Sequence, residues 1–143
     1  MRLKTWLLLV VLLIGAAACR NKDAVNPDAG ARIAGTYAVS RLAITGTGTD
    51  NIDVTLPRTG TLNGTTVTQS GQVVVTRSTE NTATMNLVLK TTGQADSSED
   101  LGTVEIRGNE LYQDNARLGT ADGTNLNIDY SEGGVRVIIV ARK

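Results

Sequence analysis

The chain has 143 residues, with no His, no Phe, one Cys, and 14 basic residues against 14 acidic ones. Without His, neither a Ser/His/Asp nor a Cys/His catalytic relay can form, and the usual His-containing zinc sites are excluded as well. A single Cys rules out an intramolecular disulfide, and a net charge of zero argues against a nucleic-acid-binding surface, which needs a basic excess. We therefore expect a protein that is not an enzyme, has no cofactor or metal site, and does not bind nucleic acid.

Residues 1–18 have the organisation of an export signal. Arg2 and Lys4 provide a positively charged start, residues 6–14 form an apolar run, and small residues precede Cys19. The apolar run is shorter than the roughly 20 residues that a membrane-spanning helix needs. We expect cleavage before Cys19, either by an ordinary secretory route that leaves a free thiol or by a route that lipidates this Cys.

The segment Ala16-Ala17-Ala18-Cys19 resembles the lipobox of bacterial lipoproteins. The resemblance implies that Cys19 carries acyl chains, and two or more such chains anchor a protein stably to a membrane. By the sorting rule of these lipoproteins, Arg20 after the Cys implies the outer membrane of a Gram-negative cell envelope, with the periplasmic or surface face left open. The expected partner is therefore the membrane, through the acyl chains on Cys19.

The chain after the signal divides into two parts. Residues 19–31 comprise the lipidated Cys and a polar stretch with Pro27 and Gly30, which predicts a flexible tether. Residues 32–143 are enough for one domain with a hydrophobic core and too few for two. Because the aromatic residues of this domain are three Tyr, its core must consist mainly of Val, Ile, Leu and Ala.

Apolar and polar residues alternate in many short segments of the domain, and no segment has a sustained helical period. Met85, Leu87 and Leu89 illustrate this alternation, which places apolar side chains on one face of a strand. The pattern predicts a polar loop over residues 92–100 and strands near residues 33–45, 51–57, 59–63, 65–69, 72–78, 82–91, 101–107, 110–115, 117–121, 125–131 and 135–142.

Turn signals lie between the predicted strands. Dipeptides that tolerate positive φ recur at Asn63-Gly64, Gly108-Asn109, Asp122-Gly123 and Gly133-Gly134, as hairpins require. The predicted fold class is all-β: an antiparallel up-and-down meander of about 8 to 10 short strands that closes into a small barrel and so hides its edges. A two-sheet β-sandwich is the alternative.

Two segments resemble lipocalins and small lipocalin-like bacterial lipoproteins. Gly35-Thr36-Tyr37 is similar to their Gly-x-Trp opening, with Tyr in place of Trp, and the last strand is similar to their closing strand. The resemblance implies a lipocalin-like (calycin-type) barrel in which a basic residue, Arg142 or Arg136, stacks on the ring of Tyr37. It also implies a barrel mouth that admits a small hydrophobic ligand.

The candidate ligand-binding residues are Tyr37, Arg41, Tyr112 and Tyr130. Strict alternation from Tyr37 through Val39 would point Arg41 inward, where it could meet a carboxylate head group. Alternatively, a bulge after Val39 would turn Arg41 to solvent and bring Leu42 and Ile44 inward.

The last strand is apolar on both faces, because Val137, Ile138, Ile139 and Val140 follow one another. Ile138 and Val140 would then lie on the outer face, where they are either covered by a neighbouring segment or form an interaction patch for an unknown protein partner. The acidic residues Asp96, Glu99 and Asp100 share one loop, and their spacing is that of a solvated turn rather than a calcium loop.

Two functions remain open at this point. In the first, an outer-membrane-anchored envelope lipoprotein binds a small hydrophobic ligand in its barrel. In the second, the barrel core is filled and the anchored protein has a structural or protein-interaction role. A pocket smaller than roughly 300 Å³ would count against the first.

Overall fold

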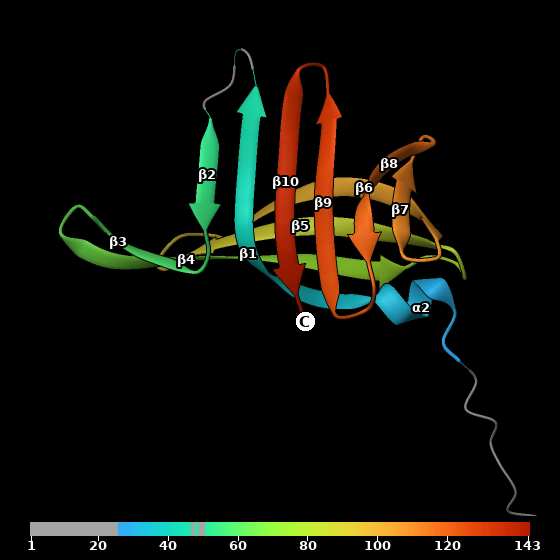
Figure 1. The fold of residues 1–143 in the computed structure, drawn as a ribbon. Helices are drawn as coiled ribbons and strands as arrows, with labels where there is room; N and C mark the ends of the chain where they lie inside the picture. Colours follow the sequence, from blue (N-terminus) through green and yellow to red (C-terminus); the bar gives the residue numbers. More distant parts are fainter. Residues whose placement is uncertain (1–25, 47, 49–50) are drawn as a thin grey trace, which may run out of the picture.

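A single ten-stranded antiparallel sheet runs through the part of the chain that the computed structural model describes, residues 26–46, 48 and 51–143. Its strand order is β2-β1-β10-β9-β8-β7-β6-β5-β4-β3, with an additional pairing between β1 and β4 (Figure 1). The strands are β1 (Gly35–Gly46), β2 (Ile52–Thr55), β3 (Arg58–Leu62), β4 (Thr65–Arg77), β5 (Thr82–Thr91), β6 (Ser97–Arg107), β7 (Glu110–Gln113), β8 (Ala116–Ala121), β9 (Asn125–Glu132) and β10 (Val135–Arg142).

The pairing of β1 with two other strands closes the sheet into a barrel. Ala38 in β1 pairs with Arg142 in β10, and Gly35 pairs with Val75 in β4. The barrel therefore has eight strands, β1 and β4 to β10, and β2 and β3 are additions to β1 and β4. The predicted meander that closes into a barrel is confirmed, and the β-sandwich alternative is wrong.

The barrel interior is the hydrophobic core. Along β5, for example, Ala83, Met85 and Leu87 are buried while the residues between them are half-buried on the outer face. The largest fully buried side chains are Tyr37, Ile33, Met85, Leu111, Leu126, Ile139, Val73 and Val104, so aliphatic residues dominate as the composition predicts.

A short helix, α2 (Ala29–Ile33), covers one end of the barrel, which we call the closed end. Asp28 caps the helix by accepting a 2.7 Å hydrogen bond from the backbone N–H of Ala31, and it forms an ion pair with Arg77 of β4. A Cβ on Gly30 would lie 2.3 Å from the carbonyl oxygen of Thr79, so only Gly allows this close approach to the β4–β5 turn. Residues 29–31, expected in the tether, thus belong to the folded domain.

The other end, which we call the open end, carries the β5–β6 connection and the β9–β10 turn. Here the strands are longer than predicted. Segments 65–69 and 72–78 form one strand, β4, because β5 pairs with it from Gln69 to Arg77. The predicted polar loop over residues 92–100 is shorter, because Ser97 to Asp100 pair with β5 and form the start of β6.

The four predicted hairpin turns are confirmed. Asn63-Gly64, Gly108-Asn109, Asp122-Gly123 and Gly133-Gly134 connect consecutive strands, and their glycines have positive φ. Among the described residues, no helix is long and apolar enough to cross a membrane.

Candidate functional site

Strands β1 and β4 pair near the closed end and then separate. Gly35 to Ala38 of β1 pair with β4, but farther along, Arg41 to Ile44 pair with β2 and the first residues of β4 pair with β3. We call this separation the fork. Figure 1 shows its result: β1 and β2 stand upright side by side and antiparallel, while β3 and β4 extend sideways as a projecting hairpin.

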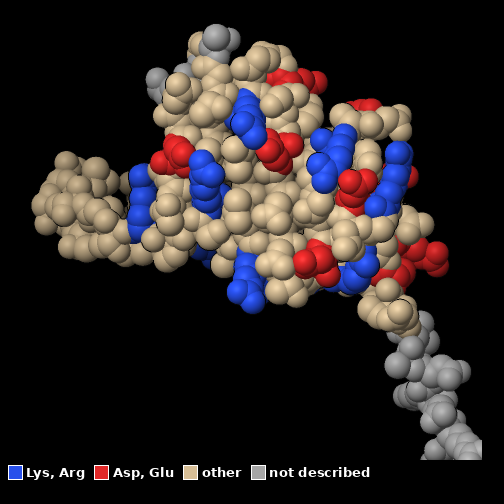
Figure 2. Space-filling model, in the orientation of Figure 1, with Lys and Arg blue, Asp and Glu red and all other residues tan. Residues whose placement is uncertain are grey.

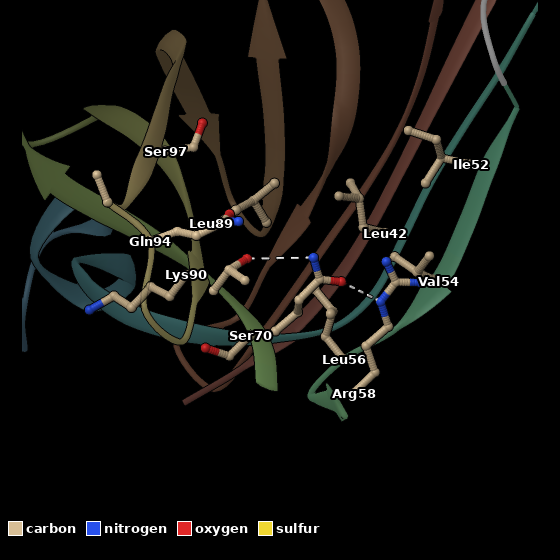
Figure 3. A pocket seen from close by; sticks show the side chains of 13 residues that line it. Leu42, Ile52, Val54, Leu56, Arg58, Ser70, Leu89, Lys90, Gln94 and Ser97 are labelled. Atoms are coloured by element: carbon tan, nitrogen blue, oxygen red, sulfur yellow. Dashed lines mark hydrogen bonds between the residues drawn. The ribbon is translucent and has the colours of Figure 1, made fainter. Parts of the chain in front are cut away.

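The fork leaves an apolar hollow of about 300 Å³, which we call the fork pocket. Leu42 of β1 and Val54 of β2 line one side, and Leu89 of β5 lines another (Figure 3). Ile52 lies at the rim with 40% of its surface exposed, which is unusual for so large an apolar side chain in this domain. The volume is at the lower limit of pockets that hold small molecules.

Gly71 of β4 makes this packing possible. A Cβ at this position would lie 3.1 Å from Leu56 Cδ1 and 3.2 Å from both Leu89 Cδ2 and Val39 Cβ. Because Gly71 has no side chain, Leu56 and Leu89 can approach the inner face of β4 where the fork begins.

A row of polar side chains borders the fork pocket. Arg58 donates a 2.6 Å hydrogen bond from Nε to Gln69 Oε1, and Gln69 Nε2 donates to Thr91 Oγ1 at 3.5 Å. In Figure 3 the guanidinium of Arg58 lies beside Val54 and Leu56, whereas the ammonium of Lys90 points away from the hollow. Lys90 instead forms an ion pair with Asp96, with 3.5 Å between Nζ and Oδ2.

A second hollow of about 310 Å³ adjoins the first along the projecting hairpin. Its lining contains Thr59, Gly60 and Thr61 of β3 and is more polar than that of the fork pocket. Arg58, Gln69, Thr91 and Gln94 border both hollows. The polar row therefore separates an apolar compartment from a mixed one.

A third hollow lies at the mouth of the barrel, and it is smaller, at about 170 Å³. Tyr130 lines it with Met85, Leu118 and Ile128, so this predicted residue does lie at the open end of the interior. Its hydroxyl donates a 2.6 Å hydrogen bond to Glu132, and this bond raises the pKa of Tyr130 above its usual value.

The structure places Tyr37 and Tyr112 away from any hollow described above. Tyr37 is fully buried at the closed end, where its hydroxyl donates a 2.7 Å hydrogen bond to the carbonyl oxygen of Ile33, and burial raises its pKa. Tyr112 lies on the outer face, next to the buried Leu111; its hydroxyl donates to Glu110 and the Arg107 guanidinium lies 4.4 Å from its ring centroid. Neither ring can contact a ligand at the open end.

The inward placement of Arg41 is wrong, and the bulge alternative is confirmed. The register of β1 against β10 shifts between Val39 and Arg41, so Leu42 is buried and Ile44 packs against the core. Arg41 is exposed and donates two hydrogen bonds to Asp53 of β2, which raise the pKa of Arg41 and lower that of Asp53.

The cation on Tyr37 is Lys143, not Arg142 or Arg136. Lys143 Nζ lies 4.8 Å from the ring centroid of Tyr37 and donates a 2.7 Å hydrogen bond to the carbonyl oxygen of Ala34. A Cβ on Gly35 would lie 2.7 Å from Lys143 Cε, so Gly35 leaves space for this side chain. The alternation of β10 turns Arg142 outward, and Arg136 is paired with Asp129. The expected stack therefore exists with a different cation.

Ile138 and Val140 are half-buried on the outer face of β10. Ile138 pairs with Ala43 of β1 and Asp129 of β9, and Val140 pairs with Arg41. Arg41 and Arg136 run beside them, and arginine side chains cover apolar neighbours with their aliphatic stems. Figure 2 shows side chains of opposite charge interspersed over this face, so the apolar pair lies among ion pairs.

The residues around the fork were not predicted as site residues. The alternation of Ile52, Val54 and Leu56 was visible in the sequence, but nothing near Arg58 or Gln69 indicates that β1 and β4 separate there. In the described part of the chain, no group of three His, Cys, Asp or Glu side chains is placed to hold a metal ion. Cys19 and residues 1–18 lie outside the described residues.

Comparison of the chain with protein-family models, with curated proteins and with solved structures finds no match.

Proposed function

We propose that this chain is a lipid-anchored, non-enzymatic protein of the bacterial outer membrane that binds a small hydrophobic molecule at the open end of its barrel. The anchor is argued from the resemblance of the segment before Cys19 to a lipobox. The binding function is argued from one observation, the apolar fork pocket of about 300 Å³.

The placement of the fork pocket supports the proposal. Its apolar walls come from β1 and β5 of the closed barrel and from β2, which pairs with β1, so the pocket exists before a ligand arrives. The chain enters the domain next to α2, at the closed end, and the pocket is at the opposite end. A membrane anchor on Cys19 would therefore leave the pocket accessible from the aqueous side.

Photo-crosslinking of the full-length protein in its own membranes tests the binding function. The probe is dodecanol that carries a diazirine on its chain, and crosslinked peptides are mapped by mass spectrometry. We expect crosslinks near Leu89 and Leu56 that excess unlabelled dodecanol abolishes.

A matched pair of variants provides the control. Leu89→Gln places a polar group in the pocket and should reduce crosslinking at least about threefold, because the pocket loses part of its apolar lining. Val88→Gln makes the same type of change on the outer face of the same strand and should leave crosslinking unchanged. Absence of saturable crosslinks in the wild type would reject the binding function and favour the structural or interaction role.

A further inference from the structure

The fork pocket and the adjoining polar hollow together have the form of a site for a molecule with two different ends. The fork pocket is apolar, the hollow beside it is mixed, and Arg58 lies on the border between them. A single aliphatic chain with a polar head would place its chain in the first and its head over the second.

The charge at the border indicates which kind of head the site would take. Arg58 has five N–H donors, and within the described residues only its Nε makes a hydrogen bond, to a neutral amide. Five other arginines are paired with carboxylates: Arg41, Arg77, Arg107, Arg117 and Arg136. Of the described arginines without a carboxylate partner, Arg32, Arg58 and Arg142, Arg58 is the one that lines the two hollows at the fork.

The residues that line both hollows also favour a head with negative charge. The lining contains Arg58 and Lys90 but no Asp or Glu, so an anion entering here meets no like charge in the lining. Lys90 is already paired with Asp96, which leaves Arg58 as the main partner. A guanidinium presents two parallel N–H donors, which match the paired oxygens of a carboxylate or phosphate.

We propose that the fork binds a single-chain amphiphile with an anionic head, with its aliphatic chain in the fork pocket and its head on the two free Nη groups of Arg58. This inference rests on the proposed binding function and adds the ligand class and the residue that selects it. Gln69 positions the guanidinium through its hydrogen bond to Nε, and Thr91 holds Gln69 in turn.

Competition against the diazirine probe tests the assignment in the full-length, membrane-bound protein. The competitors share one chain length and differ in the head: laurate, dodecyl phosphate, dodecanol and dodecyltrimethylammonium. For the wild type we expect laurate, dodecyl phosphate or both to compete at concentrations up to about fivefold lower than dodecanol, since an exposed ion pair contributes up to about 1 kcal/mol. The two anions distinguish a carboxylate from a phosphate head.

Arg58→Gln keeps hydrogen-bonding capacity and removes the charge. We expect the preference for anions over dodecanol to disappear in this variant while dodecanol competes as before. We compare, between variants, the ratio of the anion concentration to the dodecanol concentration needed for competition. Differences in how the competitors partition into the membrane therefore cancel. Arg142→Gln is the matched control: it removes an exposed arginine near the closed end and should leave the ratio unchanged.

The outcomes separate the two proposals. Saturable crosslinks at the fork with no preference for anions, or a preference that survives Arg58→Gln, would overturn the anionic assignment and leave the binding function intact. Crosslinks confined to the barrel mouth around Tyr130 would also overturn it. Absence of saturable crosslinks in every variant would reject both.

Discussion

Asp122 begins the turn between β8 and β9 and holds that turn with its carboxylate. Oδ1 accepts hydrogen bonds from the backbone N–H groups of Asn125 (2.7 Å) and Thr124 (2.8 Å), and Oδ2 accepts one from Asn125 Nδ2 (2.9 Å). These bonds lower the pKa of Asp122 to about 2, with the backbone N–H of Asn125 contributing most. The ionised form is therefore favoured by the fold even though the group is exposed.

The contribution of Asp122 to stability depends on pH. Its pKa is lower in the folded chain than in the unfolded chain, so the contribution is complete above about pH 4 to 5 and is lost as the pH falls toward about 2. For Asp122→Asn we expect a melting temperature below that of the wild type at pH 7 and a difference that shrinks toward pH 2. Thermal unfolding followed by circular dichroism between pH 2 and 7 measures this difference.

Asp96→Asn is a suitable control, because it removes one carboxylate from an exposed ion pair and should change the melting temperature little at pH 7. A difference between Asp122→Asn and wild type that stays constant over the whole pH range would contradict the role given to the ionised carboxylate.

At the scale of the elements, strands β8 and β9 approach so closely at one point that a side chain does not fit. A Cβ on Gly119 would lie 2.0 Å from the backbone oxygen of Asn127 and 2.9 Å from the Cα of Ile128. Gly119 pairs with Ile128 in the sheet, so the obstruction is the backbone of the neighbouring strand and cannot move away as a flexible side chain would.

We expect Gly119→Ala to lower the free energy of unfolding by about 1–3 kcal/mol, because the added methyl group forces the two strands apart. Gly60→Ala adds the same group on the edge strand β3, where no atom lies within 4 Å, and should change that free energy by less than about 0.5 kcal/mol. Urea unfolding of both variants gives the comparison. Equal losses for the two would show that backbone crowding between β8 and β9 is not the cause.

The elements also show which features the sequence could predict. Local signals sufficed for the strand alternation and for Gly-containing turns such as Asn63-Gly64, because φ preference and alternation are properties of adjacent residues. They failed where pairing with a distant strand decides the outcome. Residues 97–100 are polar, but they become strand because β5 offers them backbone partners.

The site was less predictable than the fold for the same reason. Tyr130 reaches the open end because simple alternation places it inside. The bulge that turns Arg41 outward and the separation of β1 from β4 depend on contacts between distant segments, so no local pattern marks Arg58 as a site residue. The short helix α2 was not predicted, because its N-cap Asp28 lies after Pro27 in a polar stretch that predicts a tether. Asp is nevertheless a common N-cap residue, so this signal was available in the sequence.

At the scale of the whole molecule, the barrel has two unlike ends. Helix α2 and Tyr37 fill the closed end, and Lys143 lies over the ring there. Eight residues lie between Cys19 and Asp28, and an extended chain over this separation reaches about 30 Å. With an anchor on Cys19, the closed end would therefore stay within about 30 Å of the attachment point.

The anchor itself is tested by Cys19→Ala. We expect this change to abolish incorporation of radiolabelled palmitate, because Cys19 is the residue that would carry the acyl chains. Asn21→Ala, two residues away, should leave palmitate incorporation unchanged. Palmitate incorporation into Cys19→Ala would contradict the lipoprotein assignment.

Strand β1 has a further consequence for how the protein folds. β1 pairs with β10, β2 and β4. Its pairing with β10 brings Ala38 beside Arg142, about a hundred residues later in the sequence. Contacts between residues so far apart in sequence require most of the chain to be ordered before they are gained, and domains dominated by such contacts fold slowly. The β1–β10 pairing that closes the barrel can therefore form only once β10 is present beside β1.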